Sequence, residues 1–235
     1  MQVKVGIVRR TTVCAAAGTA LLAAVLSGCA DSDGAGRPGA STSAGTVKAT
    51  ARAASGGTIG AAGSACELPV RFEIARHWKA KSVDSGAESS KASKGSDGSG
   101  GDPGGALAEA LLRQGPVTAA CEVDAKPAGN IGFLRVWTGK PGSSDPGRVL
   151  REFVAAEENV SKEKYHSFTT GGGVSGVEVE YLYTSKLLDE TKKECAFAVS
   201  TPDGPVVLHL GGMDTEEHEA MRPAYDLAKQ TLELG

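Results

Sequence analysis

Apolar and polar residues alternate most clearly in the C-terminal third of the chain, where they predict a group of neighbouring strands. Within 177–183 every second residue is Val or Tyr, and Glu178 and Glu180 lie between them. A period of two places these sets on opposite faces of a strand. The short connections Gly171-Gly172-Gly173 and Pro202-Asp203-Gly204 imply antiparallel pairing. We predict strands over 165–170, 174–184, 194–200 and 206–210.

A helical spacing of apolar residues, three or four apart, occurs in three segments. The first, 106–114, ends before Gly115-Pro116. The second begins at Asp145-Pro146, a favourable helix cap followed by a favourable first residue. The third begins at Asp214, with Glu217 in the position of a capping box. The apolar stripes of the last two helices are Val149, Leu150, Phe153, Val154, Ala156 and Val160, and Met221, Tyr225, Ala228 and Leu232.

Together these elements predict an α+β fold, an antiparallel sheet sandwiched by helices. Three further strands are predicted over 71–75, 117–123 and 131–138. One domain, 66–235, is long enough to bury its own core. The low-complexity run 84–105 interrupts it, and we interpret this run as a flexible insertion because 66–83 is too short to be a domain.

The N-terminal segment has the pattern of a lipoprotein signal peptide over 1–28. Lys4, Arg9 and Arg10 precede the apolar residues 11–26, which are fewer than the ~20 needed for a membrane-spanning helix. Leu26-Ser27-Gly28-Cys29 matches a lipobox, so we expect cleavage before Cys29 and attachment of diacylglycerol and an N-acyl chain to its cysteine. The expected location is the extracytoplasmic face of the cell membrane.

Composition adds limits on partners. Removal of the leader's three positive charges would change the formal net charge from −3 to −6, which argues against nucleic-acid binding. Residues 29–65 are rich in Ala, Gly, Ser and Thr without apolar periodicity, which predicts a disordered tether. Outside the cell a disulfide can persist, and Cys66, Cys121 and Cys195 allow three pairings. We favour a bridge from Cys66 to one of the other two, and the alternative is three buried, reduced cysteines.

The chemistry-bearing residues form no recognised catalytic or metal motif. We expect no metal and no cofactor besides the lipid. The glycine run at 171–173 leads into a strand and is interpreted as a hairpin turn. His209 is expected to be a satisfied strand histidine, and His218 to make ordinary surface pairs. The residues we consider for ligand or partner contact, with core packing as the alternative, are Tyr181, Tyr183, Trp78 and Trp137.

The segments FEIARHW (72–78) and VVLHLGGMDTEEHEAMRPAYDLAKQTLEL (206–234), with the order of elements, resemble the Mog1/PsbP-like fold. Within that group the chain is similar to actinobacterial lipoproteins of the LpqN/LpqT type, over residues 66–234. Families with this fold are mostly binding or assembly modules, so the resemblance implies no catalytic residues. In length, leader and class the chain also resembles CseA-like lipoproteins, which restrain an envelope-stress sigma factor and sensor-kinase system.

Three functions remain open. The first is a non-enzymatic lipoprotein that binds a membrane protein or envelope component, as a negative modulator of an envelope-stress sensor kinase in its specific form. The second is a carrier of a lipid or small hydrophobic ligand, which requires a cavity behind Tyr181 and Tyr183. The third is a hydrolase of envelope esters, which requires a histidine paired with Ser175 or Cys195.

Overall fold

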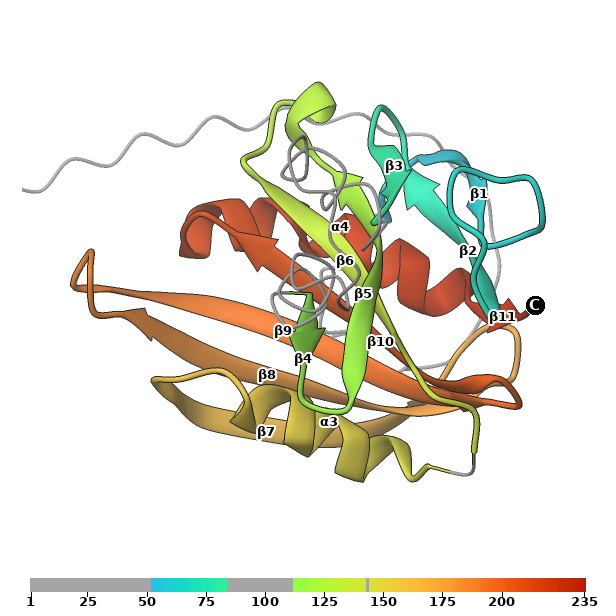
Figure 1. The fold of residues 1–235 in the computed structure, drawn as a ribbon. Coiled ribbons are helices and arrows are strands. Elements are labelled where there is room, and N and C mark those ends of the chain that lie inside the picture. The colour runs from blue at the N-terminus through green and yellow to red at the C-terminus, as the bar shows by residue number, and fades with distance from the viewer. Residues whose placement is uncertain (1–51, 84–111, 143) are drawn as a thin grey trace, which may run out of the picture. The chain divides into compact units, whose positions relative to one another are not determined.

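The structure is a computed structural model that describes residues 52–83, 112–142 and 144–235, all within the compact unit Lys48–Gly235 (Figure 1). The predicted signal peptide, Cys29, the tether before residue 52 and the insertion 84–105 lie outside the described residues. Among the residues that are described, no helix has the length and apolar character required to cross a membrane.

An eight-stranded sheet forms the centre of the described unit. Its order is β3-β5-β6-β10-β9-β8-β7, with β4 paired to β5, and the named strands pair antiparallel. The strand bounds are β3 Lys79–Ser82, β4 Arg113–Gln114, β5 Val117–Asp124, β6 Gly132–Gly139, β7 Val160–Thr169, β8 Ser175–Ser185, β9 Glu190–Thr201 and β10 Gly204–Gly212. A short 3-10 helix, η1 (Lys126–Ala128), follows β5.

A second, three-stranded sheet has the order β1-β2-β11, with β1 Ser55–Ile59, β2 Val70–Ala75 and β11 Glu233–Leu234. Two helices cover opposite faces of the large sheet (Figure 1). Helix α3 (Pro146–Ala155) buries Leu150 and Phe153 beside Val207 of β10. Helix α4 (Thr215–Thr231) buries Tyr225 beside Phe197 of β9 on the other face. The predicted α+β class, a sheet sandwiched by helices, is confirmed.

Both described helices begin where the sequence predicted. The Asp145 Oδ1 accepts a hydrogen bond from the Arg148 N–H at 2.7 Å, and the Asp214 Oδ1 accepts one from the Glu217 N–H at 2.8 Å. Such caps satisfy the free N–H groups of a first turn. The Glu217 side chain does not complete a capping box, because it accepts instead from the Ile131 N–H at 3.0 Å. That contact ties the start of α4 to β6.

The boundary of the predicted domain was wrong, because β1 lies inside the segment interpreted as tether. Strand β1 pairs with β2, and Ile59 is buried in the core. Its Gly- and Ser-rich sequence lacks strand alternation, so pairing with a neighbour defines it rather than side-chain pattern. Gly60 then allows a close approach: its φ is +107°, and a Cβ there would lie 1.9 Å from the Val70 carbonyl oxygen.

Two helix predictions also extended too far. The end of the predicted helix 106–114 is strand β4, whose Arg113 and Gln114 pair with β5, while residues 106–111 lie outside the described residues. Helix α3 ends at Ala155, so Ala156 caps it and Val160 begins β7 instead of extending the apolar stripe. In each case pairing with a distant strand overrides a local helical spacing.

A disulfide connects the two sheets. Cys66, between β1 and β2, is bonded to Cys121 of β5, with 5.9 Å between their Cα atoms. This is one of the three pairings that the sequence left open. Cys195 of β9 is a buried free cysteine, and burial raises the pKa of its thiol.

Candidate functional site

Strands β8 and β9 place one buried carboxylate on each face of the large sheet. Glu178 of β8 faces α4 and its side chain is 1% exposed. Glu194 of β9 lies on the α3 side and is 3% exposed. A buried carboxylate is costly unless charges or hydrogen bonds compensate it, so the surroundings of each define a candidate site.

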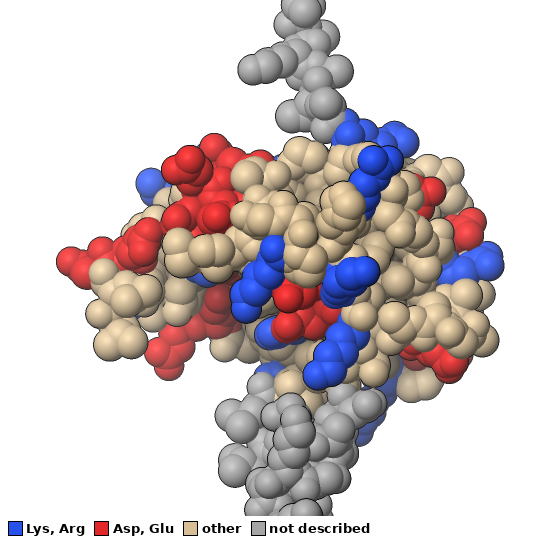
Figure 2. Space-filling view, turned by 90° about the horizontal axis from the view of Figure 1, so that it is seen from above, with Lys and Arg blue, Asp and Glu red and all other residues tan. Residues whose placement is uncertain are grey.

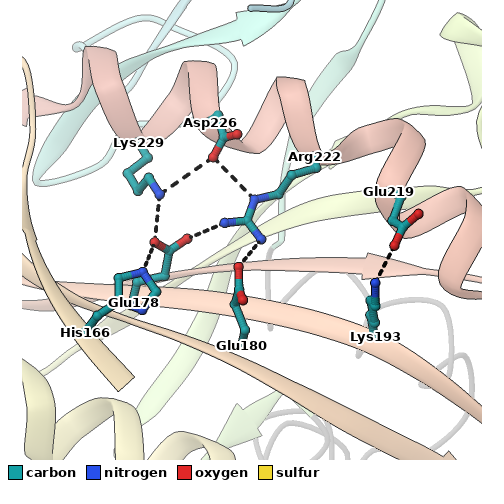
Figure 3. A network of polar contacts seen from close by, with 8 residues as sticks. All are labelled: His166, Glu178, Glu180, Lys193, Glu219, Arg222, Asp226 and Lys229. Carbon is teal, nitrogen blue, oxygen red and sulfur yellow. Dashed lines mark hydrogen bonds and ion pairs between the residues drawn. The ribbon is translucent and has the colours of Figure 1, made fainter. Parts of the chain in front are cut away.

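Three basic side chains surround Glu178 (Figure 3). Its Oε2 lies 2.7 Å from the Lys229 Nζ and 2.7 Å from the His166 Nε2, and its Oε1 accepts from the Arg222 guanidinium at 3.1 Å. Burial alone would raise the pKa of Glu178, but Lys229, Arg222 and His166 together lower it. Glu178 is therefore a structural anion that joins β7 and β8 to α4.

Further ion pairs extend this network along α4. Arg222 also donates to Glu180 at 2.8 Å and to Asp226 at 3.3 Å. One turn earlier, Glu219 of α4 pairs with Lys193 of β9 (Figure 3). The network consequently neutralises most of its own charges.

A pocket of about 300 Å³ lies beside this network, between α4 and strands β7 to β9. Seven of its ten lining residues are charged, namely Lys162, Lys164, Lys193, Arg222, Glu180, Glu194 and Glu219, although apolar atoms make up more of the wall surface than polar atoms do. Leu182 and His218 are two of the other three. Tyr181 also lines it, whereas Tyr183 does not. Charged residues of both signs around a partly apolar wall suit a small ligand that carries a charged group.

His218 departs from the surface position expected for it. Its side chain is 4% exposed, and its Nδ1 is buried without a hydrogen-bond partner in the described part of the chain. Burial first, and then the charge of Arg222, lower its pKa to about 4. The imidazole is therefore neutral at pH 7.

A second network fills the sheet face near α3. The Glu194 Oε2 lies 2.7 Å from the His209 Nε2, and the Glu194 Oε1 lies 2.7 Å from the Lys192 Nζ. The Tyr181 hydroxyl lies 2.8 Å from Glu157, 3.1 Å from Glu194 and 3.2 Å from His209. His209 is 8% exposed and has hydrogen-bond partners within the sheet, as the sequence predicted. The sequence did not reveal that these partners are Glu194 and Tyr181.

The two carboxyls of this network have opposite pKa shifts. Burial would raise the pKa of Glu194, but His209 and Lys192 lower it to about 2. Burial raises the pKa of Glu157, and the neighbouring charge of Glu194 raises it further. The Tyr181 hydroxyl has a single proton to donate, so it can bond only one of the two carboxylates at a time.

We expect Glu157→Gln to raise the free energy of unfolding at pH 7 by about 0.5 kcal/mol, the scale of one partly exposed charge interaction. Gln keeps an acceptor for Tyr181 but removes the charge near Glu194. A carboxyl with a raised folded-state pKa binds its proton more tightly when folded, so its cost is present at neutral pH and vanishes once both states are protonated at low pH. Urea unfolding at pH 7 and pH 4 measures this, with Glu158→Gln as the exposed control. A gain that persists unchanged at pH 4 would contradict the assignment.

The four residues considered for ligand contact are largely interior. Trp78, Trp137 and Tyr181 are 6%, 4% and 3% exposed, and Tyr183 is half-buried. Trp137 and Tyr181 pack with α3, whereas Trp78 belongs to the core on the opposite face. Three of the four are therefore core side chains, and of the four the pocket described above is lined by Tyr181.

The catalytic alternative also lacks its geometry in the described chain. No hydrogen bond there joins a histidine to Ser175 or to Cys195, and no group of three or more metal-ligating side chains is found among the residues described. Glu178, Glu194 and His166 were not singled out from the sequence. The one available signal was a Glu directly before the apolar run 195–199.

The chain belongs to a family whose description is "Uncharacterised lipoprotein" (Lipoprotein_23), and the match covers residues 37–232. Membership supports an extracytoplasmic, membrane-anchored lipoprotein. No curated protein matches the chain significantly. Among solved structures it is similar to the solution structure of cyanobacterial PsbP (CyanoP) from Synechocystis sp. PCC 6803. The identity is 12%, the TM-score 0.43, and the match covers 76% of this chain and 98% of that one.

Proposed function

We propose that the protein is a non-enzymatic lipoprotein, anchored through Cys29 on the extracytoplasmic face, that binds the extracytoplasmic domain of a membrane protein. One observation carries the proposal: exposed apolar side chains gather toward one end of the domain. We call this the hairpin end, and its exposed apolar residues are Ile131, Leu187, Leu188 and Met213. Exposed apolar groups that cluster mark interaction sites more often than isolated ones do.

The strand register brings these residues to the same end. Gly212 of β10 pairs with Gly132 of β6, and the Met213 N–H donates to the Ile131 carbonyl at 3.0 Å. Strand β9 runs alongside β10 and continues past it into the β8–β9 hairpin, which projects from the sheet in Figure 1. Leu187 and Leu188, at the tip, are 93% and 68% exposed.

The charge at the hairpin end indicates the kind of partner. Acidic side chains gather toward the left of Figure 2, the side on which the hairpin projects in Figure 1. Exposed or half-buried acids at this end include Asp189, Glu190, Asp214, Glu216 and Glu217. An acidic surface is repelled by anionic lipid and attracted by basic protein surfaces, which favours a protein with an apolar and basic face.

The specific form of this proposal is a negative modulator of an envelope-stress sensor kinase. A lipid anchor and a tether would raise the local concentration of the domain beside such a kinase, so a weak contact would suffice. Deletion of the gene should then raise output from an envelope-stress promoter. An unchanged reporter under wall stress would reject modulation of a sensor kinase. It would not reject binding to another membrane protein, which the crosslinking experiment below tests.

Mild crosslinking in the protein's own membranes tests partner binding. We expect a membrane protein to crosslink to the wild type. A Leu187→Ser/Leu188→Ser variant should lose at least tenfold of that yield, because these two leucines are the most exposed apolar side chains of the hairpin end. Their exposure also means that the substitutions should leave folding unchanged. Leu234→Ser, an exposed leucine of β11, is the matched control and should crosslink normally. Cys29→Ala should lose both membrane attachment and the crosslink. Equal yields from the tip variant and the wild type would reject the hairpin end as the interface.

A further inference from the structure

We propose that the pocket between α4 and strands β7 to β9 binds a small organic anion through its carboxylate or phosphate group. Lys162 and Lys164 would contact the anionic group, and Leu182 and His218 would contact the rest of the ligand. The residues that line this pocket do not include the exposed apolar residues of the hairpin end, and the proposal does not depend on the identity of any protein partner.

Uncompensated positive charge is the first reason. Arg222 is occupied by Glu178 and Glu180, and Lys193 is paired with Glu219. The third carboxylate of the wall, Glu194, is paired with Lys192 and His209. The register places Glu180 opposite Lys164, but the Glu180 carboxylate is bound to Arg222 at 2.8 Å. Lys162 and Lys164 make no ion pair with the described residues. Two lysine charges at the pocket therefore remain available to an anion.

The backbone of β7 is the second reason. The register with β8 shifts between Ser161 and Lys164, and Lys162 has a φ of 59°, in the left-handed region that favours glycine. Such a bulge bends a strand and re-aims its side chains, and strained non-glycine residues cluster at functional sites. A bulge in an edge strand can also serve to prevent pairing with another molecule. That role alone would not explain why two lysines at the bulge line a pocket.

The uncharged part of the wall is the third reason, and it limits the ligand. The imidazole of His218 lines the pocket and is neutral at pH 7, so it adds no charge to the wall. Leu182 adds a small apolar contact. A volume of about 300 Å³ is at the small end of ligand pockets. A short organic acid or phosphate ester fits this volume and the two lysine charges that the described residues leave unpaired.

The test is isothermal titration of the full chain, purified from membranes in a detergent free of phosphate, with sodium phosphate, succinate and glycerol 3-phosphate at constant ionic strength. We expect saturable binding of at least one of these probes. Lys162→Gln/Lys164→Gln should weaken it at least tenfold, because both charges at the pocket are removed at exposed positions. The control Lys140→Gln/Lys186→Gln removes two exposed lysines elsewhere and should stay within twofold.

The three probes distinguish a lipid headgroup from a free solute as the natural ligand. Tenfold tighter binding of glycerol 3-phosphate than of the other two would identify a lipid headgroup fragment, and otherwise the ligand is a free solute. Absence of saturable binding with all three probes, or equal weakening in the control, would overturn the proposal. Loss of the protein crosslink in the tip variant with unchanged titration would show that the two sites are distinct.

Discussion

A Cys66→Ala/Cys121→Ala variant is expected to lose about 4 kcal/mol of free energy of unfolding, the entropic effect of opening a loop of this length. The two cysteines are 55 residues apart in the sequence. Their bond also joins the small sheet to the large one, because Cys66 lies between β1 and β2 and Cys121 is on β5. Urea unfolding of the variant and the wild type measures the difference.

Two controls distinguish the effect of breaking the disulfide from the effect of removing two sulfur atoms. Cys195→Ala removes one buried sulfur without affecting a bond, and we expect it to cost only about 1 kcal/mol. Wild type treated with a reductant should unfold as the double variant does. A loss below about 1 kcal/mol in the double variant, or no response to the reductant, would show that the bond contributes little.

The sequence predicted the sheet and its helices from local patterns, and it could not predict the Glu178 network. The alternation in β8 correctly separates Val179 and Tyr181 from Glu178, but it does not indicate whether the face with the glutamates is buried. Glu178 is buried because Lys229 and Arg222 arrive from α4, more than forty residues further along the chain. A periodicity within one strand contains no information about such a partner.

Strands β1 and β4 show the same limit in the backbone. Neither has apolar alternation, and each exists because its N–H and C=O groups pair with a stronger neighbour, β2 or β5. The periodic sequences of β8 and α3 suffice to predict these elements, whereas short edge strands without such a pattern form only by pairing with the rest of the sheet. The pocket rim on β7 is of this second kind, since its bulge arises from pairing with β8.

The second large effect is expected at Glu194, where Glu194→Gln should cost roughly 3 kcal/mol, within the range for breaking a buried ion pair. Gln keeps the shape of the side chain but leaves the Lys192 ammonium, 20% exposed, without its carboxylate. The contacts that remain to Lys192 are the Gly212 carbonyl at 2.7 Å and the Tyr183 ring, whose centre is 5.4 Å from the ammonium, and neither carries a negative charge. The loss therefore reports an uncompensated charge rather than a cavity. Glu190→Gln, an exposed glutamate of the same strand, is the matched control.

The pH dependence of that loss identifies its cause. The pKa of Glu194 is about 2 in the folded protein against a usual value of 4.5. A lowered folded-state pKa stabilises the protein above pH 4.5, and this contribution disappears as the pH falls toward 2. Because Gln does not titrate, the difference between wild type and Glu194→Gln should shrink from pH 7 to pH 4 and again to pH 3, measured by urea unfolding. A difference that stays constant over this range would mean that packing, and not the charge of Glu194, holds the α3 face together.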